Sequence, residues 1–219
     1  MPSLYGVARS RASRPLWLLA EIGLPFDHIA VIQAYRLADP AALDAPFNTT
    51  SPGFLAINPM GQIPAYQDGD LVLTESLAIC QHIARKHGGM LGPDSLDEAA
   101  LIDQWMLFAA TNIEDPALEM MFTIADGKAK TAEDDAKIAL CVEKLNRPLA
   151  RLEAHLASHD WLVSDRFTVA DIMVAEILRY AQINTALMDA HPHAAAWLKK
   201  CQSRPAYQVM WSARLAEPA

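Results

Sequence analysis

The order in which hydrophobic patterns follow one another along the chain constrains its fold more than any other feature. The first part is predicted to form a strand, a helix, a strand, a hairpin and a helix, at residues 2–7, 12–22, 26–32, 63–73 and 75–86. After that, only helical spacing recurs, at residues 97–124, 131–157, 168–182, 191–202 and 204–212. This order predicts an α/β layer joined to an all-helical bundle.

The segment between these two parts has the composition of a linker. Residues 87–93 contain three Gly and one Pro, which favours a break in regular structure. We therefore predict a first domain at residues 1–87, a linker at 88–95 and an all-helical domain at 96–219.

Charge and hydropathy exclude two classes of partner. The formal net charge is -8, and the 18 Lys and Arg residues are scattered without a basic run, so nucleic acid is a poor partner. No apolar run approaches the ~20 residues that a membrane span needs, so no membrane association is expected. The first residues also lack the charged and apolar regions of an export signal.

The cysteines and histidines bear on compartment and metal binding. Cys80, Cys141 and Cys201 lie far apart in apolar helical segments, which suits buried thiols in a reducing compartment and predicts a cytoplasmic protein. The seven His residues form no pair at ligand spacing, so we assign no metal.

Ser10 lies where the first strand ends and the first helix begins, within the segment from Arg9 to Arg14. The N-terminus of a helix offers free N–H groups and a partial positive charge, which stabilise a thiolate or a carboxylate. Nearby Arg residues add to this field. The alternative is that Ser10 and Ser13 are only helix caps and that the Arg side chains form a solvated face.

Two further segments carry features of a peptide-binding site. Ile63-Pro64 opens a strand, and X-Pro is the one common cis site, so the backbone of Ile63 is available to an extended peptide; an ordinary strand-entry proline is the alternative. Glu75 and Ser76 lie at the start of the helix predicted at 75–86, where a hydroxyl and free N–H groups can receive a carboxylate and Glu75 can accept from an ammonium group. A simple helix cap is the alternative there.

Taken together, these motifs resemble those of the glutathione transferase family. Ser-x-x-x-Arg-Pro at 10–15, Asn-Pro-x-Gly-Gln-Ile-Pro at 58–64 and Thr-Glu-Ser-x-Ala-Ile at 74–79 match family motifs in order and spacing. Thr168 and Asp171, three residues apart, resemble the family's capping box. The resemblance covers nearly the whole chain and points to a serine-type, bacterial or theta-like member.

The resemblance implies a thioredoxin-like N-terminal domain that binds glutathione as a co-substrate. It implies that Pro64 is cis, that the backbone of Ile63 pairs with the cysteinyl part of glutathione, and that Glu75 and Ser76 hold its γ-glutamyl end. Thr49 and Gln62 fall near positions where the family contacts the glycyl carboxylate.

The resemblance also implies that Ser10 hydrogen-bonds the sulfur, with Ser13 as the alternative. A tyrosine-type mechanism is not expected, because Tyr5 lies inside the first strand and suits a packed aromatic. Neither position 10 nor position 13 is a Cys, which disfavours thiol exchange through a protein cysteine.

The predicted function is conjugation of the glutathione thiolate to a small hydrophobic electrophile, a detoxification reaction. We expect the segment from Asp97 to Phe122 to supply an apolar wall for that electrophile. A glutathione-dependent isomerase or reductase on the same fold is the alternative, and a non-catalytic glutathione-binding adaptor is the third hypothesis.

The family resemblance implies a homodimer as well. The N-terminal domain of one subunit then packs on the helical domain of the other, and Asp103 and Gln104 reach the glutathione of the partner.

Overall fold

The computed structural model describes residues 1–126 and 130–217, which form two compact units. The first unit contains residues 1–92 together with the chain from Pro205 onward, and the second contains residues 93–204. Residues 127–129 and 218–219 of the predicted 96–219 domain lie outside the described residues.

The first unit is built on a four-stranded sheet in the order β2-β1-β3-β4. The strands are β1 (Ser3–Tyr5), β2 (Asp27–Ile29), β3 (Ala65–Asp68) and β4 (Leu71–Thr74). β1 pairs with β2 in parallel and with β3 in antiparallel orientation, and β3 and β4 form an antiparallel pair. The predicted strand-helix-strand unit and hairpin are thus confirmed.

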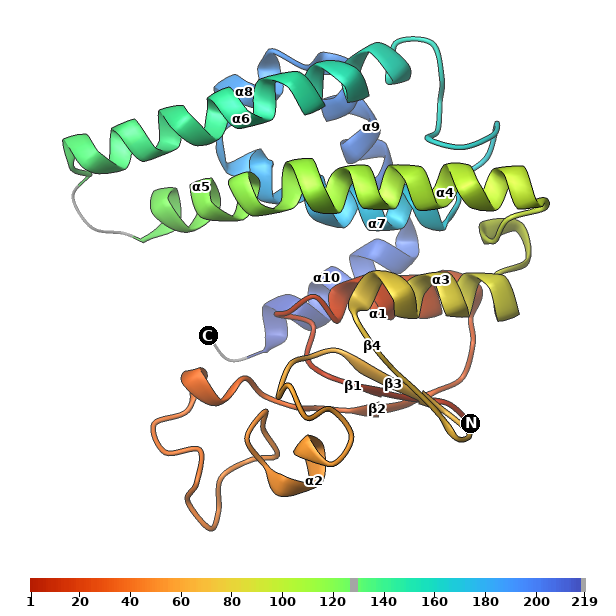
Figure 1. Cartoon of the computed structure of the whole chain (residues 1–219), viewed down its shortest axis with the longest axis vertical. Helices are drawn as coiled ribbons and strands as arrows, with labels where there is room; N and C mark the ends of the chain where they lie inside the picture. Colours follow the sequence, from red (N-terminus) through yellow and green to blue (C-terminus); the bar gives the residue numbers. More distant parts are fainter. Residues whose placement is uncertain (127–129, 218–219) are drawn as a thin grey trace. The chain divides into compact units, whose positions relative to one another are not determined.

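Helices cover both faces of this sheet. The helical elements of the unit are α1 (Ser13–Ile22), η1 (Ala34–Arg36), α2 (Pro52–Leu55), α3 (Ser76–His87), η2 (Gly89–Leu91) and α10 (Pro205–Ala216). α1 and α3 lie on one side of the sheet and α2 lies on the other (Figure 1). α1 ends at Gly23, whose φ of 70° is in the left-handed region that closes a helix.

The alternation of side chains along β1 and β3 sorts the core of this unit into two layers. Tyr5 and Ala65 are directly opposite each other and pack in one apolar cluster with Phe54 of α2. Their neighbours Leu4 and Tyr66 are also opposite each other, are buried, and point to the other face because successive side chains alternate.

Helix α10 belongs with the first unit, whereas the sequence prediction assigns residues 204–212 to the C-terminal helical domain. The physical reason is its packing on α1, where the rings of Trp17 and Tyr207 meet edge to face at a centroid distance of 4.9 Å. Edge-to-face geometry is favourable for aromatic pairs. The remaining domain boundaries stay predictions.

The second unit is entirely helical within its described residues. Its elements are α4 (Leu96–Ala109), η3 (Ala110–Glu114), α5 (Asp115–Ala125), α6 (Ala132–Leu156), α7 (Val169–Leu178), η4 (Arg179–Ile183), α8 (Thr185–Asp189) and α9 (Pro192–Gln202). Every residue of α7 is buried, which places this helix at the centre of the unit. The predicted capping box at Thr168 and Asp171 is present at its start. No helix of residues 1–126 or 130–217 is long and apolar enough to cross a membrane.

Glu98 near the start of α4 links this helix to the loop before α7. Its carboxylate accepts two hydrogen bonds from the guanidinium of Arg166 and one each from the hydroxyl of Ser164 and the backbone N–H of Asp94. The hydrogen bonds from Arg166, the largest cause, lower the pKa of Glu98 to about 2 despite its burial.

We expect this carboxylate to make folding stability depend on acidity. A carboxylate whose pKa is lower in the folded state stabilises the fold above its unfolded pKa and loses that contribution as the pH falls toward the folded value. The free-energy advantage of the wild type over Glu98→Gln should therefore shrink, by on the order of 3 kcal/mol, between about pH 5 and pH 2. Urea unfolding at several pH values measures it, with Asp165→Asn, an exposed neighbour, as the control. A free-energy difference between the wild type and Glu98→Gln that does not change with pH would contradict the lowered pKa of Glu98.

Candidate active site

The loop between β1 and α1 holds Ser10 in a defined geometry. The Ser10 hydroxyl donates to the carbonyl of Val7 at 2.7 Å and accepts from the backbone N–H of Ala12 at 3.0 Å. Ser10 remains partly exposed, whereas Ser13 in the first turn of α1 is fully buried. The side-chain oxygen accessible to a ligand at the start of α1 is therefore that of Ser10.

Gly6 brings this loop against the segment that contains Ile63 and Pro64. Its φ of 146° is one that L side chains rarely adopt, and a Cβ at this position would lie 2.9 Å from the Cβ of Ala12, 3.5 Å from that of Ile63 and 3.7 Å from the Cα of Pro64. Only glycine permits this approach. The carbonyl of Gly6 also lies 2.9 Å from Nε2 of His28, which ties the loop to β2.

The Ile63–Pro64 peptide bond is cis, as the family resemblance implies. Ile63 is partly exposed and lies two residues before the first residue of β3. Its backbone groups are thus outside the β3 ladder, in a position where an extended peptide can pair with them.

Thr49 and Gln62 lie close to each other in the structure. Gly61 packs on the carbonyl of Thr49, since a Cβ there would lie 2.8 Å from that oxygen, and Gln62 is the next residue. Gln62 is exposed, but Thr49 is buried and its hydroxyl accepts from the backbone N–H of Ala34 at 2.9 Å. Gln62 is therefore the more accessible of the two.

The backbone turns at Glu75, and α3 begins at the next residue, Ser76. Glu75 has φ 67° and ψ 107°, a left-handed conformation that is uncommon for a residue other than glycine, and its side chain is exposed. Ser76 is buried, and its hydroxyl oxygen accepts from the guanidinium of Arg14 at 3.0 Å. This contact joins the start of α1 to the start of α3.

Arg14 is 1% exposed, so the interpretation of the arginines as a solvated face is wrong for this residue. Arg11 is exposed and Arg9 is partly exposed. Because Arg14 donates to the Ser76 oxygen, the hydroxyl proton of Ser76 is left to donate elsewhere, and the guanidinium adds positive charge beneath any carboxylate bound there. This role of Arg14 is not predictable from local sequence, because its partner Ser76 lies 62 positions away.

Tyr5 is a packed aromatic, as predicted. It is buried in the cluster with Phe54, and its hydroxyl donates to Oε1 of Gln67 at 3.3 Å.

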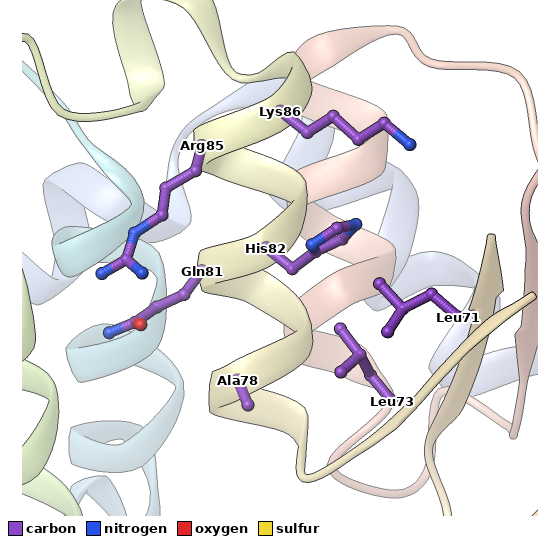
Figure 2. Close-up of a pocket in the computed structure, with 7 residues that line it drawn as sticks. All are labelled: Leu71, Leu73, Ala78, Gln81, His82, Arg85 and Lys86. Atoms are coloured by element: carbon purple, nitrogen blue, oxygen red, sulfur yellow. The ribbon is translucent and has the colours of Figure 1, made fainter.

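A hollow of the first unit lies between β4 and α3. It has a volume of about 560 Å³, and its lining residues are Leu71, Leu73, Ala78, Gln81, His82, Arg85 and Lys86. Figure 2 shows His82 and Lys86 on the side of α3 that faces Leu71 and Leu73. Lys86 forms an ion pair with Asp68, which lowers the pKa of that carboxyl.

The remaining predicted residues belong to the second unit. Asp103 and Gln104 lie on α4, the first partly exposed and the second exposed. In the segment from Asp97 to Phe122, Trp105 and Met120 are buried, whereas Phe122 is exposed. Within residues 1–126 and 130–217, no group of three or more His, Cys, Asp or Glu side chains could hold a metal ion.

Comparison with known proteins agrees with this geometry. Residues 3–85 match the N-terminal domain of glutathione S-transferase, and residues 113–205 match the C-terminal domain. The chain is 36% identical over 211 residues to glutathione S-transferase 4 of Zea mays, across 93% of this chain and 88% of that protein. The chain belongs to the glutathione S-transferase family.

Solved structures of the family support the same fold. Glutathione transferase F7 from Populus trichocarpa superimposes with a TM-score of 0.81 at 28% identity, covering 98% of this chain and 99% of that one. The theta class transferase from Xanthomonas axonopodis pv. citri, solved with glutathione bound, gives a TM-score of 0.75 at 27% identity and 95% coverage of both chains. The prediction of a thioredoxin-like domain followed by a helical domain is therefore confirmed for this family member, while its class within the family stays a prediction.

Proposed function

We propose that this glutathione transferase conjugates the thiolate of glutathione to a small hydrophobic electrophile, with Ser10 as the residue that stabilises the sulfur. The observation that carries the proposal is the meeting of three segments within one unit. Gly6 brings the Ser10 loop against Ile63 and Pro64, and Arg14 joins the start of α1 to Ser76.

Each end of glutathione has a chemically matched partner in this arrangement. The backbone of Ile63 pairs with the cysteinyl residue, and Ser76, backed by Arg14, donates to the γ-glutamyl carboxylate. Glu75 is exposed and accepts from the ammonium group. Gln62, and less directly Thr49, contacts the glycyl end. The sulfur then faces Ser10 at the start of α1.

Ser10 acts as a hydrogen-bond donor and keeps its own proton. Its hydroxyl donates to the carbonyl of Val7, so donation to sulfur requires this proton to turn away from that carbonyl. The helix N-terminus and the hydroxyl both favour the charged form of the thiol and so lower its pKa. The partial exposure of Ser10 and the burial of Ser13 support this choice between the two serines.

The reaction itself forms one carbon–sulfur bond. The thiol proton passes to solvent, the thiolate attacks the electrophilic carbon, and the leaving group departs with the bonding electron pair. A donor at the sulfur speeds this reaction by lowering the pKa of the bound thiol, which raises the fraction present as thiolate near neutral pH.

Two measurements test the proposed function. Calorimetry with reduced glutathione should detect binding, and mixing with a chlorodinitrobenzene should release chloride in proportion to the conjugate formed. Binding without turnover across a panel of electrophiles would favour the adaptor, and turnover confined to isomerisation or reduction would favour the alternative enzyme. No binding at all would overturn the proposal.

We also propose a cytoplasmic homodimer of the serine type. All three cysteines are buried thiols, which suits a reducing compartment. Leu71 of β4 is exposed, at 41% accessible, and lines the hollow at α3 together with Leu73, which gives an apolar surface that a second copy would cover. The contribution of Asp103 and Gln104 to a partner's site stays part of this proposal, and a monomer in light scattering at micromolar concentration would contradict it.

A further inference from the structure

The end of helix α10 lies against the loop that carries Ser10. The carboxylate of Glu217 accepts from the backbone N–H of Ala8 at 2.6 Å through one oxygen and from that of Arg9 at 2.7 Å through the other. Both residues directly precede Ser10, and all of these groups belong to the same compact unit.

Arg214 adds two contacts to the same two residues. Its guanidinium donates to the carbonyl of Ala8 at 2.5 Å, and its own carbonyl accepts from Nε of Arg9 at 3.0 Å. On another side, the amide of Gln33 donates to the carbonyl of Arg9 at 3.1 Å. The N–H and C=O groups of residues 8 and 9 are therefore all held by side chains.

The position of Ser10 depends on this backbone. Its hydroxyl is oriented by the Val7 carbonyl and the Ala12 N–H, one on each side of the held residues. Hydrogen bonds from backbone N–H groups to a carboxylate are shorter and stronger than neutral ones, so the two that Glu217 accepts attach the loop firmly to the end of α10. Glu217 is partly exposed and outside the apolar core, so its contribution to global stability is small compared with its effect on the loop.

We propose that Glu217 is a positioning residue for the transferase reaction: by binding the backbone N–H groups of residues 8 and 9, it holds the Ser10 hydroxyl at the sulfur of glutathione. This inference rests on the proposed function. Glu217 itself touches neither the substrate nor the reacting atoms, and it acts through Ser10. The neighbouring Arg9 and Arg214 offset its negative charge, so that the charge does not oppose formation of the thiolate.

The test uses Glu217→Ala and Glu217→Gln in the full chain. The alanine variant removes both acceptors, whereas a glutamine offers one acceptor oxygen and turns an NH2 group toward the second N–H, so its effect should be smaller. At pH 6.5 we expect kcat to fall about 10-fold for Glu217→Ala, because the pKa of the bound thiol rises by about one unit. The dissociation constant of glutathione should change less than about 2-fold, since its binding groups lie elsewhere. The control is Glu143→Gln, which removes one negative charge at an exposed position on α6 and should behave like the wild type.

A double mutant separates positioning from a structural role. If Glu217 acts through Ser10, adding Glu217→Ala to Ser10→Ala should cause little further loss of kcat, because residues that act as a unit are not additive. A full additional 10-fold loss would overturn the proposal, as would a bound thiol with unchanged pKa in both Glu217 variants. Should Glu217→Ala fail to fold, Glu217→Gln decides by the same readouts.

Failure of this inference and failure of the proposed function are distinguishable. The proposed function fails if the wild type shows no conjugation or if Ser10→Ala leaves it unchanged. The role of Glu217 fails if those two results are as expected and the Glu217 variants still keep the wild-type thiol pKa and turnover.

Discussion

Replacing Ser10 with alanine is expected to lower kcat/KM for conjugation by about 10²-fold at pH 6.5, the effect typical of losing one donor to a reacting anion. The hydroxyl is the partly exposed donor at the start of α1, while Ser13 is buried. Without it the bound thiol is left with the helix N-terminus alone, so its pKa moves back toward the reference of ~8.5. Ultraviolet absorption of the thiolate, followed against pH in the complex with glutathione, measures that shift.

The affinity for glutathione should be nearly unchanged in this variant. The groups proposed to bind the tripeptide are Ile63, Glu75 and Ser76, which Ser10 does not contact. Turnover should also recover as the pH is raised, because the missing hydroxyl then matters less to ionisation. Ser13→Ala is the matched control and is expected to stay within about 3-fold of the wild type. Loss of the low thiol pKa in Ser13→Ala, with Ser10→Ala unaffected, would reverse the two assignments.

The largest effect on stability is expected at Asp171. Its carboxylate is fully buried and accepts from the backbone N–H groups of Thr168 and Leu162, at 2.9 and 3.1 Å, and from the indole of Trp197 at 3.0 Å. It thereby joins the start of α7 to the preceding loop and to α9. Asp171→Ala leaves these buried donors without their acceptor, at a cost of about 1–3 kcal/mol for each unsatisfied group.

We expect Asp171→Ala to lower the unfolding free energy by about 4 kcal/mol and Tm by roughly 10 °C. Asp171→Asn keeps one acceptor oxygen and should lose less. Calorimetry and urea unfolding give both values, with Asp189→Ala, an exposed carboxylate at the end of α8, as the control expected within about 0.5 kcal/mol of the wild type. A loss below about 1 kcal/mol for Asp171→Ala would mean that the donors find other acceptors.

The parts of the fold that follow from local chemistry were predictable from the sequence. Apolar spacing located β1, α1 and α3, and the strand pattern at 63–73 located the hairpin. Thr168 and Asp171 are three residues apart, which is the spacing that a capping box requires. The cis bond before Pro64 followed from the family resemblance rather than from local chemistry, because most X-Pro bonds are trans.

Features that depend on distant partners were not predictable. The burial of Arg14 is explained by Ser76, and the place of α10 in the first unit by the contact between Trp17 and Tyr207. The role of Glu217 depends on two N–H groups more than 200 positions earlier in the chain. Helical periodicity likewise predicted one helix at 97–124, where the π-helical turn η3 separates α4 from α5.

A crystal structure of the full chain soaked with glutathione is the most direct test of how this transferase works. We predict the sulfur within hydrogen-bonding distance of the Ser10 hydroxyl, with the tripeptide paired to the backbone of Ile63 and its γ-glutamyl end at Ser76. A sulfur nearest another hydroxyl, or a tripeptide bound away from Ile63, would contradict the proposed roles of Ser10 and Ile63.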